Sequence, residues 1–85
     1  MDCLAVMQSG NYALRLCDIF NKKGYVFEVV STPCTIAHGG CGYSLKFPEE
    51  YKDIVINEAR LRNIKIVAIY RVIPGLTKNK YEKIL

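Results

Sequence analysis

The sequence predicts an α+β domain of the ferredoxin-like type, a β-α-β-β-α-β sandwich in which two helices cover one face of a four-stranded antiparallel sheet. Two segments, 12–23 and 48–62, repeat apolar residues at helical spacing. Four shorter segments rich in apolar and β-branched residues lie before, between and after them. With 85 residues, of which 51% are hydrophobic, the chain can build one core. We expect residues 1–73 to form this domain, and residues 74–85 to be a C-terminal extension that packs on it or on a partner subunit.

The first β-α unit is expected at the start of the chain. Cys3 to Gln8 is a short apolar run, and Ser9-Gly10-Asn11 ends it as a strand ends at the N-terminus of a helix. Gly24 follows the helix as its C-terminal cap. The apolar residues between these points have helical spacing: Ala13, Leu16, Cys17 and Phe20.

Two strands joined by a long loop come next. Residues 25–31 are rich in aromatic and β-branched side chains, and residues 42–47 alternate apolar and polar side chains, so both segments are expected to be strands. The loop from Thr32 to Gly42 has about eleven residues, and loops of this length in small domains usually carry function or are disordered.

The second helix is expected to begin near Pro48, with Glu49 and Glu50 at its positive end. Its inward stripe is Tyr51, Ile54, Val55, Glu58 and Leu61. Residues 65–72 form the fourth strand, with Ile66, Ala68, Tyr70 and Val72 on one face.

The tail from Leu76 to Leu85 is predicted to be a short amphipathic helix, with Leu76, Tyr81, Ile84 and Leu85 inward. Some strands are apolar on both faces, as with Val26 and Val30 opposite Phe27 and Val29. We therefore expect the sheet face away from the helices to be covered, either by this tail or by a second subunit in a homodimer.

Composition limits the compartment and the partners. No apolar run approaches the roughly 20 residues of a membrane span, and Met1-Asp2-Cys3 lacks the basic start of a signal peptide. We therefore expect a cytoplasmic protein without a membrane partner. There, cysteines are buried, catalytic or metal-binding more often than they form disulfide frameworks. The formal charge of +4 favours anionic partners but does not by itself indicate nucleic acid.

The loop from Thr32 to Gly42 contains two cysteines and the only histidine: Cys34, His38 and Cys41. Cys41 lies between Gly40 and Gly42, so neighbouring side chains do not shield its thiol. Gly39, Gly40 and Gly42 can point consecutive N–H groups at one anion. If the protein has a chemistry, we expect it to be sulfur chemistry at this loop.

The predicted topology places this loop beside Ser9, Gly10 and Asn11, since the first two strands run parallel. The N-terminus of a helix lowers the pKa of a nearby thiol and binds anions. Arg60 or Arg62, at the end of the second helix, is expected to add positive charge at the same edge.

The cysteines and the histidine have structural as well as chemical interpretations. Cys3 and Cys17 are interpreted as small core residues. Cys41 is either the reactive thiol or a turn cysteine without a chemical role. Cys34 is a candidate resolving thiol for Cys41, because the six residues between them can bend, although they need not. His38 is either an exposed loop residue, a proton-transfer group for a loop cysteine, or a ligand in the set Cys34-x3-His38-x2-Cys41. Three ligands are one short of a closed zinc site, so we expect no metal and no cofactor.

The run Ser31-Thr32-Pro33-Cys34, followed by Gly40-Cys41-Gly42-Tyr43-Ser44-Leu45-Lys46-Phe47, resembles the selenium/sulfur carrier-like family of small bacterial proteins. The likeness extends over most of the first 72 residues. The resemblance implies that Cys41 holds a sulfur or selenium atom. A cysteine-desulfurase-like donor and an acceptor enzyme are then the partners, and the chain is a carrier rather than a stand-alone enzyme.

Two other functions remain open from the sequence. Cys34 and Cys41 are also suited to a thiol-disulfide switch in an interaction module. An RNA-recognition module is the weaker alternative, because such modules stack bases on aromatic side chains of the central strands. Residues 3–8 contain no aromatic residue.

Overall fold

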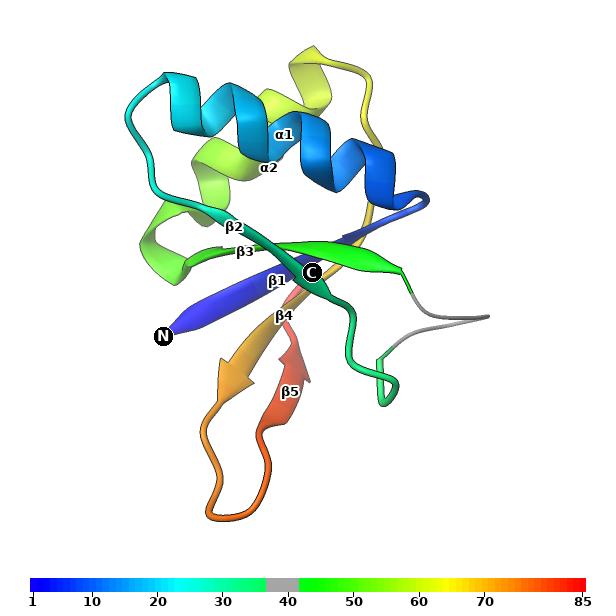
Figure 1. Cartoon of the computed structure of the whole chain (residues 1–85), viewed down its shortest axis with the longest axis vertical. Coiled ribbons are helices and arrows are strands. Elements are labelled where there is room, and N and C mark those ends of the chain that lie inside the picture. Colours follow the sequence, from blue (N-terminus) through cyan, green and yellow to red (C-terminus); the bar gives the residue numbers. More distant parts are fainter. Residues whose placement is uncertain (37–41) are drawn as a thin grey trace.

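The computed structural model describes residues 1–36 and 42–85, which form an antiparallel sheet with two α-helices on one side (Figure 1). Along the chain the elements are β1 (Asp2–Met7), α1 (Gly10–Lys22), β2 (Glu28–Ser31), β3 (Tyr43–Pro48), a 3-10 turn (Glu49–Tyr51), α2 (Lys52–Leu61), β4 (Ile66–Ile73) and β5 (Lys80–Lys83). The strand order is β2-β3-β1-β4-β5, and each neighbouring pair is antiparallel. The α+β class is confirmed, but the described sheet has five strands where the sequence predicts four.

The fifth strand replaces the helix that was predicted for the tail. Residues 80–83 pair with β4, in the register Tyr70↔Lys83 to Ile73↔Lys80. Arg71 of β4 lies opposite Glu82 and donates a hydrogen bond to its carboxylate at 2.7 Å. Leu76, predicted to point inward, is fully exposed in the turn between the strands. The helix prediction was wrong because pairing with the edge of β4 determines the conformation of this segment.

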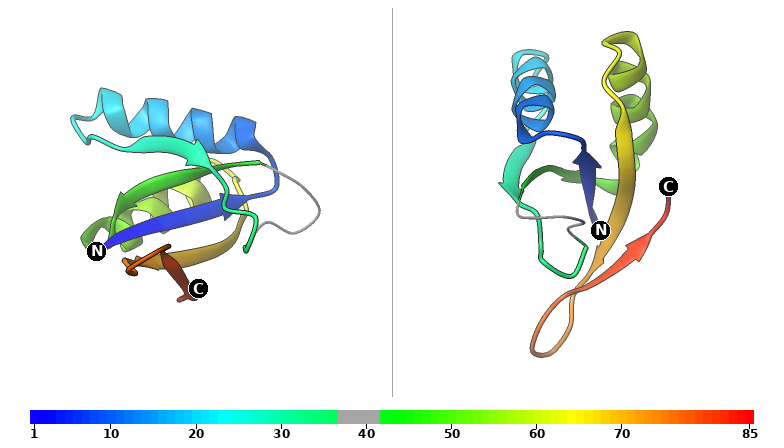
Figure 2. Two further views of the ribbon diagram at one scale, coloured as in Figure 1. Left: turned by 60° about the horizontal axis from the view of Figure 1, so that its bottom comes forward. Right: turned by 90° about the vertical axis from the view of Figure 1, so that its right-hand side faces the viewer.

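The core lies between the helices and the sheet. Cys3, Ala5 and Met7 of β1 alternate onto the helix side, while Leu4 points to the opposite face. Figure 2 shows α1 and α2 side by side above this layer. The fully buried side chains at its centre come from both layers: Leu16, Phe20, Leu45, Phe47, Val55 and Ile69.

Both helices end in the same way. The N–H of Gly24 donates to Asn21 at 3.1 Å and the N–H of Tyr25 donates to Phe20 at 3.0 Å, with Gly24 at φ 97°. Asn63 has φ 57° after α2, where its N–H donates to Arg60 at 3.2 Å and the N–H of Ile64 donates to Ala59 at 2.8 Å. These pairs of bonds satisfy carbonyl groups that a helix end leaves unpaired.

The second helix is shorter than predicted, and its predicted inward stripe is confirmed for Tyr51, Val55 and Glu58 but wrong for Ile54 and Leu61. Its first turn is the 3-10 turn Glu49–Tyr51. The buried residues of α2 are Val55, Glu58 and Ala59, whereas Leu61 is 78% exposed. Glu58 accepts hydrogen bonds from Lys23 at 2.7 Å and from Arg62 at 2.9 Å, and these bonds hold the pKa of its carboxyl below the usual value. This carboxylate links the end of α1 to α2.

Two strand predictions also change in detail. The predicted strand 25–31 begins only at Glu28, because Tyr25 packs edge-on against Phe20 and Tyr51, with ring centres 5.6 and 5.2 Å away. In β4 the register shifts opposite Val6 and Met7, so that Ile66 packs on the core while Ala68 faces the other side. Ile66 and Ala68 were predicted to share a face, and the irregularity separates them.

Candidate functional site

Exposure divides the cysteines of the described residues into two groups. Cys3 and Cys17 are buried in the core, and Cys34 is exposed. Burial raises the pKa of the Cys3 thiol, and the nearby Glu49 carboxylate adds to the effect. Burial also raises the pKa of Cys17, whose Sγ donates to the carbonyl of Phe27 at 3.3 Å. A raised pKa leaves little reactive thiolate near neutral pH, so both buried cysteines are suited to packing rather than to sulfur exchange.

Hydrogen bonds join the two ends of the loop from Thr32 to Gly42, which we name the thiol loop. The N–H of Thr32 donates to the carbonyl of Gly42 at 2.8 Å. The hydroxyl oxygens of Thr32 and Ser44 are 2.5 Å apart, and both residues are buried. The bond between the hydroxyl groups is shielded from water, and together the two bonds fix the positions at which the loop leaves β2 and enters β3. We name this pair of contacts the loop clamp.

A tight turn presents the Cys34 thiol. The N–H of Ile36 donates to the carbonyl of Pro33 at 3.0 Å, which places Cys34 and Thr35 at the centre of a four-residue turn. Ile36 is 7% exposed and anchors the far end of the turn, whereas Cys34 is exposed. The turn therefore holds the thiol outward from a fixed base.

The loop clamp lies next to the N-terminus of α1. A methyl group added at Gly10 would be 3.0 Å from Cδ2 and 3.3 Å from Cβ of Tyr43, the first residue of β3. Ser9 caps the helix, and its hydroxyl accepts a hydrogen bond from the N–H of Asn11 at 3.2 Å. Tyr43, which follows Gly42, thus lies against the first residue of α1, at the positive end of that helix.

Several predicted site residues lie outside the described residues: His38, Gly39, Gly40 and Cys41. Their predicted roles therefore stay predictions. Within residues 1–36 and 42–85 there is no group of three or more histidine, cysteine or acidic side chains placed to hold a metal ion. The set Cys34-x3-His38-x2-Cys41 extends beyond this part of the chain.

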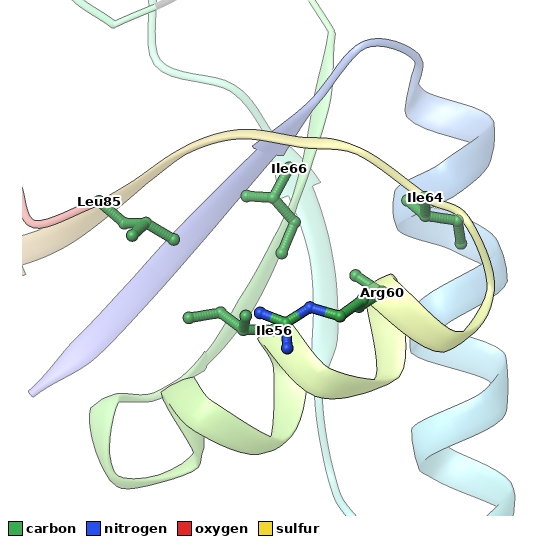
Figure 3. Close-up of a pocket in the computed structure, with 6 residues that line it drawn as sticks. Ile56, Arg60, Ile64, Ile66 and Leu85 are labelled. Carbon is green, nitrogen blue, oxygen red and sulfur yellow. The ribbon is translucent and has the colours of Figure 1, made fainter.

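The two arginines at the end of α2 have neighbours within the described residues. Arg62 donates to Glu58 on the side of Lys23. Arg60 lines an apolar pocket of about 280 Å³ between α2 and β4, with Ile64, Ile66 and Leu85 around it. Figure 3 shows its side chain extending along the helix toward Ile56. Both side chains therefore have neighbours other than the thiol loop.

The sheet face away from the helices is not an open platform for bases. On the two central strands it presents Leu4, Ser44 and Lys46, none of which is aromatic, and Leu4 and Ser44 are buried. Modules that stack RNA bases need exposed aromatic side chains there. This geometry disfavours the RNA-recognition interpretation.

Neither the loop clamp nor the position of the lysines beyond it follows from the sequence alone. Thr32 and Ser44 are hydroxyl residues at the two ends of the loop, but only the register Val30↔Ser44 brings them together. Lys46, Lys78 and Lys80 line hollows near Cys34, although Lys78 and Lys80 belong to a segment far away in sequence. No short sequence pattern indicates how β2 and β3 align, or that residues 78–80 lie near the turn at Cys34.

Among the described helices, none is both long and apolar enough to cross a bilayer. A comparison with curated proteins found no match, and neither did a comparison with solved structures. A scan against protein families matched residues 2–71 to the family described as "Putative Se/S carrier protein-like". The match includes β1 to β3, α1, α2 and the thiol loop. It confirms the resemblance seen in residues 31–47, and the chain belongs to the Se/S carrier protein-like family.

Proposed function

We propose that this protein carries a sulfur or selenium atom on Cys41 and passes it to an acceptor protein. The observation that carries the proposal is the distribution of thiols: Cys3 and Cys17 are buried, and Cys34, in the same loop as Cys41, is exposed. Family membership supports the carrier function. A carrier needs an accessible thiol more than a deep cavity, and it need not be an enzyme by itself.

The loading step is a thiol exchange without a resident cofactor. The Cys41 thiolate attacks the outer sulfur of a persulfide on a cysteine-desulfurase-like donor, a Cys41 persulfide forms, and the donor thiolate leaves. Gly39, Gly40 and Gly42 would donate N–H groups to the anionic sulfur. The N-terminus of α1 at Ser9 and Gly10 would add partial positive charge.

The outer sulfur of the Cys41 persulfide can leave the carrier by two routes. A nucleophile of the acceptor enzyme attacks the outer sulfur, and the Cys41 thiolate leaves. Alternatively, the Cys34 thiolate attacks the inner sulfur, hydrosulfide leaves, and a Cys34–Cys41 disulfide forms that an external thiol must reduce. We assign proton transfer in these steps to His38, because an imidazole can accept a proton and donate it again. The exchange belongs in the cytoplasm, where thiols stay reduced.

We also propose that residues 1–73 are a ferredoxin-like unit to which β5 has been added. The order β2-β3-β1-β4 and the alternation of strands and helices support this interpretation. In such a unit the loop after β2 and the start of α1 lie at the same edge, and the contact of Gly10 with Tyr43 agrees with that.

Intact-mass spectrometry without reductant tests the function. The protein is incubated with a cysteine desulfurase and cysteine, alongside Cys34→Ser and Cys41→Ser. We expect a gain of about 32 Da that dithiothreitol removes and that Cys41→Ser abolishes. Cys34→Ser should still load. A loss of about 2 Da on oxidation, with no gain from the desulfurase, would instead indicate a Cys34–Cys41 redox switch.

A further inference from the structure

A groove crosses the sheet face opposite the helices and passes the thiol loop. One hollow, of about 220 Å³, has an aliphatic floor made by Leu4, Val30 and Val72. A second, of about 390 Å³, lies between the turn at Thr35–Ile36 and the β4–β5 hairpin. Both hollows are lined by Asn79 and Tyr81, so they adjoin. Figure 2 shows the segment after β2 and the hairpin below the sheet, on the side away from the helices.

The turn that carries Cys34 borders both hollows, although Cys34 itself lines neither of them. Pro33 lines the smaller hollow and Thr35 lines the larger one. The residue between them is Cys34, which is exposed at the centre of the turn closed by Ile36. A ligand that fills both hollows must therefore pass the turn that carries this thiol.

The groove is positively charged. Lys46 lines the smaller hollow, Lys78 and Lys80 line the larger one, and no acidic side chain is among the described residues that line either. Lys46 has a long contact of 3.7 Å to Asp2. Within residues 1–36 and 42–85, Lys78 and Lys80 form no ion pair. Three lysines around a concave surface raise the local concentration of anionic ligands.

The floor and the charge together indicate the class of ligand. Val30, Val72 and Leu4 offer an aliphatic surface, which suits apolar side chains better than flat bases. Among the described residues that line the hollows, Tyr81 is the only aromatic one. Lysines beside an aliphatic floor complement a chain in which acidic and apolar side chains alternate. That pattern belongs to an extended protein segment.

We propose that this groove binds an acidic, extended segment of the protein that exchanges sulfur with this chain, and so holds the partner against the turn that carries Cys34. The identity of the partner rests on the proposed function, whereas the binding of an acidic segment in the groove does not. Its test therefore needs no sulfur transfer.

The probe is a short fluorescein-labelled peptide of alternating glutamate and leucine, and its binding is followed by fluorescence anisotropy. We expect Lys78→Glu/Lys80→Glu to weaken binding at least about tenfold. Arg15→Glu/Lys65→Glu makes the same change of charge at exposed positions on α1 and before β4, and should weaken binding less than about twofold. Equal losses in the two variants would overturn the proposal, since net charge alone would then explain binding.

A second measurement tests the position of the ligand. In a Cys41→Ser background, saturating peptide should slow alkylation of Cys34 by iodoacetamide at least about fivefold, and Lys78→Gln/Lys80→Gln should remove this protection. Binding without protection would overturn the proposal. So would tighter binding of oligouridylate than of the peptide at the same salt concentration, because the groove would then be a nucleic-acid site. Loss of sulfur loading with intact peptide binding would refute the proposed function alone.

Discussion

At the scale of single residues, the environment of each sulfur atom decides its chemistry. Cys17 both donates to the carbonyl of Phe27 and accepts from Asn21 at 3.5 Å, while Cys34 is exposed at the centre of a turn. Thiols of the same type therefore differ in access and in the fraction that is ionised.

This difference predicts selective alkylation. At about pH 8, iodoacetamide should modify Cys34 at least about tenfold faster than Cys3 or Cys17 in the native protein, because burial raises the pKa of the latter two. Peptide mapping after timed quenching measures the rates. In guanidinium chloride the difference should disappear. Rapid labelling of Cys17 under native conditions would contradict its buried position.

The burial of individual side chains was in part predictable from the local sequence. Cys17 falls on the apolar stripe of α1, so its burial follows from helical spacing. The loop clamp was not predictable, because a hydrogen bond between Thr32 and Ser44 depends on how β2 and β3 align.

At the scale of elements, both helices end at a residue with positive φ. The expected cap at Gly24 is confirmed, and at 97° this φ disfavours any side chain. Asn63 tolerates its φ of 57° because its side chain is short and polar.

Paired substitutions test these ends. Gly24→Ala should lower the free energy of unfolding by about 1 to 2 kcal/mol, since alanine is strained in the left-handed region. Asn63→Gly should raise it by about 0.5 kcal/mol, because glycine adopts this conformation without strain. Urea unfolding followed by circular dichroism measures both. A loss of stability in Asn63→Gly would mean that the asparagine side chain has another role.

The link between the helices should depend on pH. The pKa of Glu58 is lower in the folded protein than in the unfolded chain, because Lys23 and Arg62 donate to its carboxylate. The stabilisation is therefore complete above the unfolded pKa of about 4.3 and disappears as the pH falls through the lower, folded value.

Glu58→Gln should lower the free energy of unfolding by about 1 kcal/mol near pH 7, and the difference from the wild type should shrink below about pH 4. Asp18→Asn breaks the exposed pair with Lys22 and is the control, with an expected effect below about 0.5 kcal/mol. A difference for Glu58→Gln that persists at low pH would show that packing, and not charge, is responsible.

β5 could not be predicted from the sequence of residues 80–83. Lys80-Tyr81-Glu82-Lys83 contains one apolar residue, so it has neither the alternation of a half-buried strand nor a β-branched side chain. Tyr81, Ile84 and Leu85 have helical spacing, which led to the wrong prediction. The edge of β4 determines the outcome, and that edge exists only after the rest of the sheet has formed.

At the scale of the whole molecule, the C-terminal segment is part of the packed structure. Ile84 packs against the core and its N–H donates to the carbonyl of Ile69 at 2.9 Å, while Leu76 is exposed in the hairpin turn. The hairpin also forms one wall of the groove.

Two truncations of side chains separate these roles. Ile84→Ala should lower the free energy of unfolding by about 1 to 2 kcal/mol, less than for a fully buried isoleucine because Ile84 is only half-buried. Leu76→Ala should change it by less than about 0.5 kcal/mol. Thermal unfolding measures both. Equal melting temperatures for Ile84→Ala and wild type would mean that the Ile84 side chain does not help to hold β5, and that the backbone bonds and the Arg71–Glu82 pair suffice.

The loop clamp affects how strongly the stability of the protein depends on the length of the thiol loop. Thr32 forms hydrogen bonds to Gly42 and to Ser44, so the two ends of the loop are fixed to each other where they join β2 and β3. The free energy of closing a loop varies only with the logarithm of its length, so a longer or shorter insert between these anchors alters stability by about 0.6 kcal/mol for each doubling. Segments of different length can therefore be inserted between these anchors at a small cost in stability.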